Sequence, residues 1–254
     1  LLAIDLPAPQ VTLVTTVVGL VLLLAYATAR GRLRDLVPRH PGLAVLRALL
    51  LGADTILIHY AFKLLPLSEA YLIAFLTPIF VAVLGFALLG ERLSRLAWIG
   101  VVLGFIGVTV ALRPGTTTLN IGHVAAFAST VFFALSLLLL RRAKAAESDE
   151  ALVGTLLVVM TPVALLTVLG STGFSAMQSS HLGIGLVAGA LGLAGHALLV
   201  RAFRAGEASV VAPFQYSQII WGCLYGALLF AAPVEPYTIA GAVIIIFSGW
   251  LVLK

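Results

Sequence analysis

The sequence has few charged residues and almost no sulfur-containing ones. Only 10% of its 254 residues are charged and 61% are hydrophobic, whereas a soluble domain is about one-quarter charged. Its one cysteine, Cys223, lies within an apolar stretch, so the chain has no internal disulfide and no thiolate metal site of the usual spacing. Most residues must therefore face lipid or other helices, and we expect neither a metal nor a cofactor.

Basic residues outnumber acidic ones by 15 to 10, but they do not form the cluster that nucleic-acid binding requires. They stand singly or in small groups at the ends of apolar stretches, where they orient helices in a membrane. The expected partners are therefore membrane lipid and a small-molecule solute, with no nucleic acid. The sequence gives no indication of an oligomeric state.

Apolar stretches of about 20 residues, the length that crosses a bilayer core, recur from end to end. They predict an all-α integral membrane protein with nine transmembrane helices and short loops. The predicted spans are residues 8–29, 44–64, 68–89, 94–112, 120–140, 151–170, 182–203, 209–231 and 236–253.

The positions of the basic residues predict the orientation of these spans. If the loop at residues 30–47 is cytoplasmic, thirteen of the 15 Lys and Arg residues, Arg47 among them, lie inside, and only Lys63 and Arg113 lie outside. The C-terminus is then cytoplasmic. Glu91, next to Arg92 at the inner ends of two spans, is expected to pair with neighbouring arginines.

An internal repeat is visible at an offset of 141 residues. This shift aligns residues 61–63 with 202–204 and Gly100 with Gly241, and it aligns the spans in order. The sequence therefore predicts a duplication.

The two predicted repeats are residues 1–115 and 119–254. The span at 120–140 has no counterpart within the sequence, so its mate is expected before Leu1. The predicted architecture is a five-plus-five inverted repeat that lacks its first helix here. Because each repeat has an odd number of spans, the copies should lie antiparallel, as in many secondary transporters.

Several short motifs carry a resemblance to a known family. They are LLPLSEA at residues 64–70, LTP at 76–78, LGER at 89–92, LRPG at 112–115 and VAPFQY at 211–216. Together they resemble the EamA-type branch of the drug/metabolite transporter superfamily, over essentially the whole chain. The resemblance implies metabolite transporters of the bacterial inner membrane, including exporters and importers of amino acids, vitamins and nucleoside-like cofactors.

Asp54 lies near the middle of its span, where an isolated charge costs at least a few kcal/mol. It is either a solute or proton site, or a neutral carboxyl that packs helices. His59 lies about 140° further round the same helix and does not share its face. His196 is one position from the residue that the offset pairs with Asp54, so the two are predicted to approach each other; the alternative is a helix-packing hydrogen bond.

Two further spans offer aromatic faces. Gln215, Gln218, Trp221 and Tyr225 fall within about 120° of one helix surface and form a polar–aromatic stripe, either a cavity wall or ordinary packing. On the repeat-related span, Pro78 shares a narrow face with two aromatic residues and should kink the helix. The predicted substrate-binding residues are Asp54, His59, Tyr71, Phe75, His196, Gln215, Gln218, Trp221 and Tyr225.

These features predict a secondary transporter of amino-acid-like, cationic or aromatic solutes that works by alternating access, with export slightly favoured. Import of a vitamin or nucleoside-like cofactor is the alternative, and Asp54 or His196 could couple transport to protons. An intramembrane enzyme acting on lipid-linked substrates is the rival class. It would need clustered catalytic groups, and no HExxH or GxSxG element occurs at the span ends.

Overall fold

The computed structural model describes residues 6–113, 115, 118–143, 147–171, 173–230 and 235–252. All regular structure in these ranges is helical, and seven of the helices are long and apolar enough to cross a membrane. The other two predicted spans are an interrupted helix at residues 208–230 and a 17-residue helix, Pro236–Val252. The expectation of an all-α membrane protein is confirmed; the predicted end of the last span, Leu253, lies outside the described residues.

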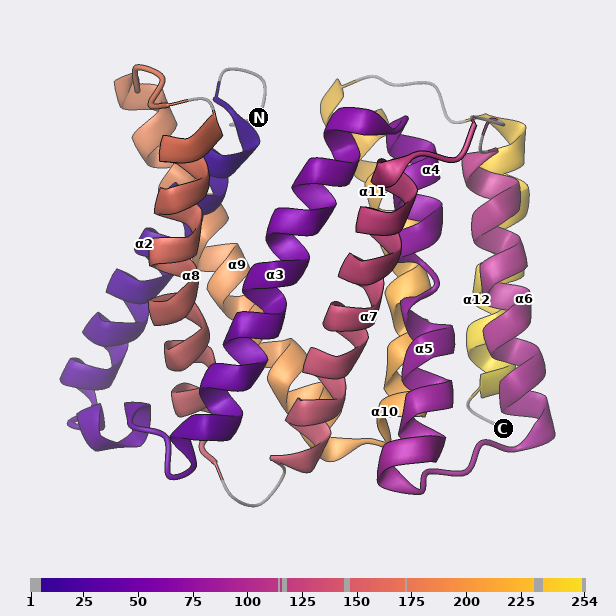
Figure 1. Ribbon diagram of the computed structural model, residues 1–254, viewed down its shortest axis with the longest axis horizontal. Coiled ribbons are helices and arrows are strands. Elements are labelled where there is room, and N and C mark those ends of the chain that lie inside the picture. Colours follow the sequence, from indigo (N-terminus) through magenta and orange to yellow (C-terminus); the bar gives the residue numbers. More distant parts are fainter. Residues whose placement is uncertain are drawn as a thin grey trace. The chain divides into compact units, whose positions relative to one another are not determined.

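Figure 1 shows the helices in chain order. Three short irregular turns interrupt them: two 3₁₀ turns at Leu33–Leu36 and Ala212–Tyr216, and a π-helical turn at Gly85–Leu89. The helices are α2 (Ala8–Ala29), α3 (Pro41–Leu64), α4 (Leu67–Ala74), α5 (Thr77–Leu84), α6 (Arg95–Leu112), α7 (Ile121–Arg142), α8 (Asp149–Ser171), α9 (Ser179–Ala205), α10 (Ala208–Val211), α11 (Ser217–Phe230) and α12 (Pro236–Val252).

The chain forms two compact units, each built from both halves of the sequence. Unit 1 comprises Leu1–Ile56 and Arg142–Ala205, and unit 2 comprises Leu57–Arg141 and Gly206–Lys254. The boundary falls within α3, so the first part of that helix belongs to unit 1.

In unit 1, α2 packs against α8 in the opposite direction. A Cβ added at Gly19 would lie 3.5 Å from Leu157, and one at Gly154 would lie 3.5 Å from Leu23. Rising numbers on one helix therefore meet falling numbers on the other. Such small residues let helix backbones approach closely in lipid.

Helix α9 packs on α2 in the same direction. Added Cβ atoms at Gly185 and Gly189 would lie 2.9 and 2.5 Å from Val14 and Val18, respectively. The two helices are therefore closest along this stretch, near the first half of each.

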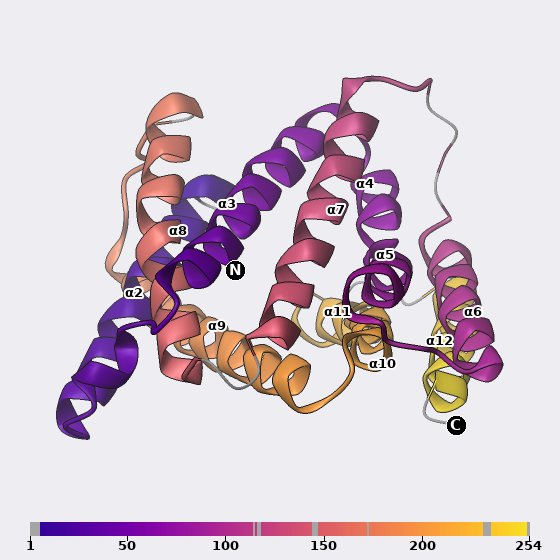
Figure 2. The same cartoon turned by 60° about the horizontal axis from the view of Figure 1, so that its bottom comes forward.

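In unit 2, α6 and α12 lie side by side in both views (Figures 1 and 2). They are antiparallel, because a Cβ at Gly100 would lie 2.7 Å from Val252, while one at Gly107 would lie 3.0 Å from Ile245. The glycines that looked like packing positions in the sequence have this role here.

Two spans of unit 2 are broken, and they pack against each other. Helix α4 ends at Ala74 and α5 begins at Thr77, whose hydroxyl donates to the Ala74 carbonyl at 2.6 Å. Pro78 has no N–H with which to bond that carbonyl, so the predicted break is confirmed. The second span runs from α10 through the 3₁₀ turn, which contains Pro213, into α11.

The junction after the π-helical turn differs from the prediction. Glu91 does not pair with Arg92 or its other sequence neighbour Arg95. Its carboxylate accepts the backbone N–H groups of Ala208 and Ser209 at 3.0 Å each, and it lies 3.3 Å from Arg141 Nε. Orphan N–H groups at a helix start attract a carboxylate more strongly than mobile side chains in water do, which explains the correction.

Candidate functional site

A series of aromatic rings runs through unit 2 and includes three of the predicted residues. Ring centroids are 6.5 Å apart for His59 and Phe62, 5.2 Å for Phe62 and Tyr71, 6.4 Å for Tyr71 and Phe75, and 6.3 Å for Phe75 and Tyr216. These five residues come from α3, from α4 and its break, and from the 3₁₀ turn. We call them the aromatic series.

The series ends at a fixed residue. Tyr216 is completely buried, its hydroxyl lies 3.3 Å from the carbonyl of Val101, and its ring covers Gly104. At the other side of Phe75, Tyr71 is 45% exposed. The series therefore leads from an accessible ring to a rigid one, at the point where both broken helices meet.

Sequence reasoning placed Tyr216 just off the predicted stripe and did not select Phe62. The offset of 141 residues pairs Phe75 with Tyr216. That pairing was the available signal, because both residues are aromatic and each stands beside a proline-containing break.

Helix α11 carries the rest of the predicted stripe. Trp221 and Tyr225 are each 53% exposed, and their rings stack with centroids 6.3 Å apart. Gln218 is also exposed and Gln215 is half-buried. The four side chains thus present a polar–aromatic surface of the kind that binds amphipathic solutes; their part in solute binding stays a prediction.

In unit 1, Asp54 on α3 and His196 on α9 are both half-buried. Arg47 was expected in a cytoplasmic loop, but it lies within α3 and is only 1% exposed. Its Nη1 donates to the Leu152 carbonyl of α8 at 3.2 Å, and it interacts electrostatically with His196. The burial follows from its position inside the apolar helix that packs on α8.

Arg47 and Asp54 are seven residues apart, so they lie within about 20° of each other on the same face of α3, two turns apart. This spacing is visible in the sequence. Counting Arg47 with the cytoplasmic loop residues concealed it.

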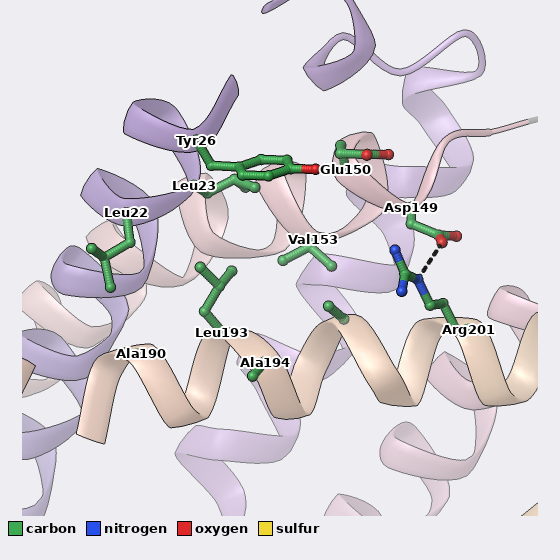
Figure 3. A pocket seen from close by; sticks show the side chains of 11 residues that line it. Leu22, Leu23, Tyr26, Asp149, Glu150, Val153, Ala190, Leu193, Ala194 and Arg201 are labelled. Carbon is green, nitrogen blue, oxygen red and sulfur yellow. Dashed lines mark hydrogen bonds and ion pairs between the residues drawn. The ribbon is translucent and has the colours of Figure 1, made fainter. Parts of the chain in front are cut away.

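A cavity of about 420 Å³ opens in unit 1 between α2, α8 and α9. Figure 3 shows apolar side chains such as Leu22 and Leu193 along it, and the Tyr26 ring lying across it with its hydroxyl towards Glu150. It lies beyond the close contact of α2 with α9, where these helices separate. None of the nine predicted residues is among those that line it.

The charges at this cavity are paired with one another. Asp149 bonds Arg201 at 3.2 Å and also pairs with Arg204, while Glu150 lies 3.7 Å from Arg32. The cavity therefore offers an apolar volume with a neutralised rim. In the described part of the chain, no group of three or more His, Cys, Asp or Glu residues could hold a metal ion.

Antiparallel apolar helices, two broken spans that meet at aromatic rings and buried ionisable side chains define a multi-pass membrane transporter. The chain belongs to the EamA-like transporter family, whose model matches residues 1–113 and again 120–254. The family and its named relatives are transporters of small molecules rather than enzymes.

Relatives with printed functions differ in solute and direction. The chain is 25% identical to a riboflavin transporter of Vibrio cholerae, over 96% of this chain and 82% of that one. It is 26% identical to an S-adenosylmethionine uptake transporter of Rickettsia felis, over 89% and 76%. It is 27% identical to a pseudopaline exporter of Pseudomonas aeruginosa, over 74% and 66%.

A solved crystal structure matches the fold with a TM-score of 0.82 and 21% sequence identity, covering 96% of this chain and 86% of that one. At this identity the likeness concerns the fold alone.

Proposed function

We propose that this protein exports an amphipathic, amino-acid-like, cationic or aromatic metabolite across the cytoplasmic membrane by alternating access. The observation that supports this most is the aromatic series, which meets both helix breaks at Phe75 and Tyr216. Aromatic faces attract ring systems and cationic groups, and a helix break allows the local movement that alternating access needs. Asp54 supplies a counter-charge for a cationic group.

Import of a vitamin or nucleoside-like cofactor is the second candidate. It is supported by the relatives named for riboflavin and for S-adenosylmethionine uptake. Both solutes carry ring systems that would stack on aromatic side chains, so direction separates the two candidates better than ring chemistry does.

We place the protein in a bacterial inner membrane with a cytoplasmic C-terminus, because the basic residues predict this orientation. Proton coupling is part of the same proposal. Asp54 and His196 are ionisable residues within spans, and such residues commonly mark proton pathways.

The test is counterflow in proteoliposomes loaded with unlabelled solute. The panel contains amino acids, quaternary amines, riboflavin and S-adenosylmethionine, each with and without an imposed pH gradient. Saturable exchange of an amino-acid-like or cationic solute supports the first candidate, whereas exchange of riboflavin or S-adenosylmethionine alone supports the second. Export and import are then separated by loading inside-out and right-side-out membrane vesicles.

The proton hypothesis uses the same preparation. Asp54→Asn and His196→Ala should each reduce flux driven by the pH gradient while leaving counterflow at equal pH less affected. Unchanged gradient-driven flux in both variants would refute proton coupling at these residues.

A further inference from the structure

Arg47 is a buried cation whose charge no group in the chain neutralises. Its side chain is 1% exposed, and its Nε and Nη2 have no hydrogen-bond partner among the residues that the structure describes. Its one bond goes from Nη1 to the neutral carbonyl of Leu152. The nearby His196 cannot neutralise a cation in either of its protonation states.

This arrangement is costly unless an anion completes it. A guanidinium keeps its charge in proteins, and an unpaired buried charge costs several kcal/mol. The charges around the cavity at α2, α8 and α9 are paired, so Arg47 stands apart from the other arginines of unit 1.

The two unpartnered nitrogens have a defined geometry. Nε and Nη2 lie on one edge of the planar guanidinium and direct two parallel N–H bonds away from it. This edge matches the two oxygens of a carboxylate, and such bidentate pairs are among the stronger hydrogen-bonded contacts. Leu152 holds Nη1, which fixes the plane and leaves that edge free.

We propose that Arg47 binds a carboxylate of the transported solute through Nε and Nη2. The proposal rests on the proposed function, since it assigns the anionic end of an amino-acid-like solute. Asp54, two helical turns further along the same face of α3, stands ~10 Å away along the axis. A solute with a carboxylate towards Arg47 and a cationic group towards Asp54 would meet opposite charges in order along one helix.

The first arm of the test measures binding without transport. The unfolding temperature of the purified full chain is recorded against rising sodium acetate, sodium phosphate and sodium chloride at equal ionic strength. The variants are Arg47→Met, Arg47→Lys and, as a control, Arg201→Met, which removes an exposed arginine of the same unit. Arg47→Met should fold at least as well as the wild type, because a neutral side chain removes the unpaired charge.

Acetate should raise the unfolding temperature of the wild type and of Arg201→Met saturably. The rise should be absent in Arg47→Met and smaller in Arg47→Lys, which keeps the charge but lacks the planar edge. An equal rise in all four proteins, or none beyond chloride in the wild type, would overturn the proposal. A rise with phosphate alone would overturn the carboxylate assignment.

The second arm measures counterflow on the same preparations, so that the two proposals can fail separately. Arg47→Met should raise the KM of a carboxylate solute at least tenfold and leave that of its amide unchanged. Saturable exchange that Arg47→Met does not alter would refute the role of Arg47 and leave the transporter intact. An acetate effect at Arg47 without any exchange would refute the proposed function and leave the oxyanion site.

Discussion

At the scale of single residues, the closest contacts of unit 2 depend on glycine. A Cβ added at Gly104 would lie 2.4 Å from ring carbons of Tyr216 and 3.0 Å from Ser248 Oγ. The buried tyrosine has no room to retreat, so Gly104→Ala should lower the free energy of unfolding by about 1–3 kcal/mol. Gly222→Ala is the matched control, because nothing lies within 4 Å of its added Cβ. Thermal unfolding in detergent measures both, and equal stability of the two variants would contradict the packing described.

Glu91 makes the stability of unit 2 depend on pH. Burial raises the pKa of its carboxyl, but hydrogen bonds from Ser209 and Ala208 and the charge of Arg141 lower it more, so the pKa lies below 4.5. A lowered pKa stabilises the folded state above the ordinary value, and this contribution is lost as the pH falls through the folded-state pKa. Wild-type stability should therefore hold from neutral pH down to about 4.5 and fall below it.

Glu91→Gln removes this contribution. Its amide NH₂ would oppose the N–H groups that the carboxylate accepts, so we expect a loss of about 1–3 kcal/mol at neutral pH. The difference from the wild type should shrink below pH 4.5. Glu207→Gln, an exposed neighbour at the same junction, should behave like the wild type throughout. A difference that does not vary with pH would refute the role given to the Glu91 charge. Chemical unfolding followed by tryptophan fluorescence measures it.

At the scale of elements, the breaks in the two spans are the features most directly tied to transport. Pro213 lacks the N–H that would continue the α-helix, so Pro213→Ala should favour a continuous helix from α10 to α11. We expect a several-fold lower transport rate with stability equal or higher, because the break is lost. Pro236→Ala, at the first residue of α12, is the control, since a proline there removes no helical bond. A transport rate like that of the wild type would contradict the role of the break.

The sequence was sufficient to predict where the elements lie. Apolar length located the spans, and Pro78 located one break, because both depend on local chemistry. The burial of Arg47 and the contact of Phe75 with Tyr216 depend on which faces of distant helices meet, and the periodicity of one helix does not carry that information. The partner of Glu91 was missed for the same reason, since it lies more than 100 residues away in the chain.

At the scale of the whole molecule, the helices support the predicted duplication. Helices α2 and α8 begin 141 residues apart, and so do α6 and α12. Each pair packs antiparallel within its unit, as the inverted arrangement requires. The first-repeat helix expected before Leu1 stays a prediction.

The predicted orientation can be tested with reporter fusions. A fluorescent protein attached to the C-terminus should be fluorescent, which marks the cytoplasm, and alkaline phosphatase fused after Arg113 should be active, which marks the outside. Replacing Lys63, the other outer basic residue, with Gln should leave both signals unchanged. The opposite pattern of signals would reverse the proposed topology.

The central claim is that solute binds at the aromatic series of unit 2. The most direct measurement is counterflow of the solute found in the panel by Phe75→Leu, with Phe247→Leu as its control, since Phe247 is a 51% exposed ring on α12 outside the series. The account predicts at least a tenfold higher KM in Phe75→Leu and an unchanged KM in Phe247→Leu. An unchanged KM in a folded Phe75→Leu protein would contradict it.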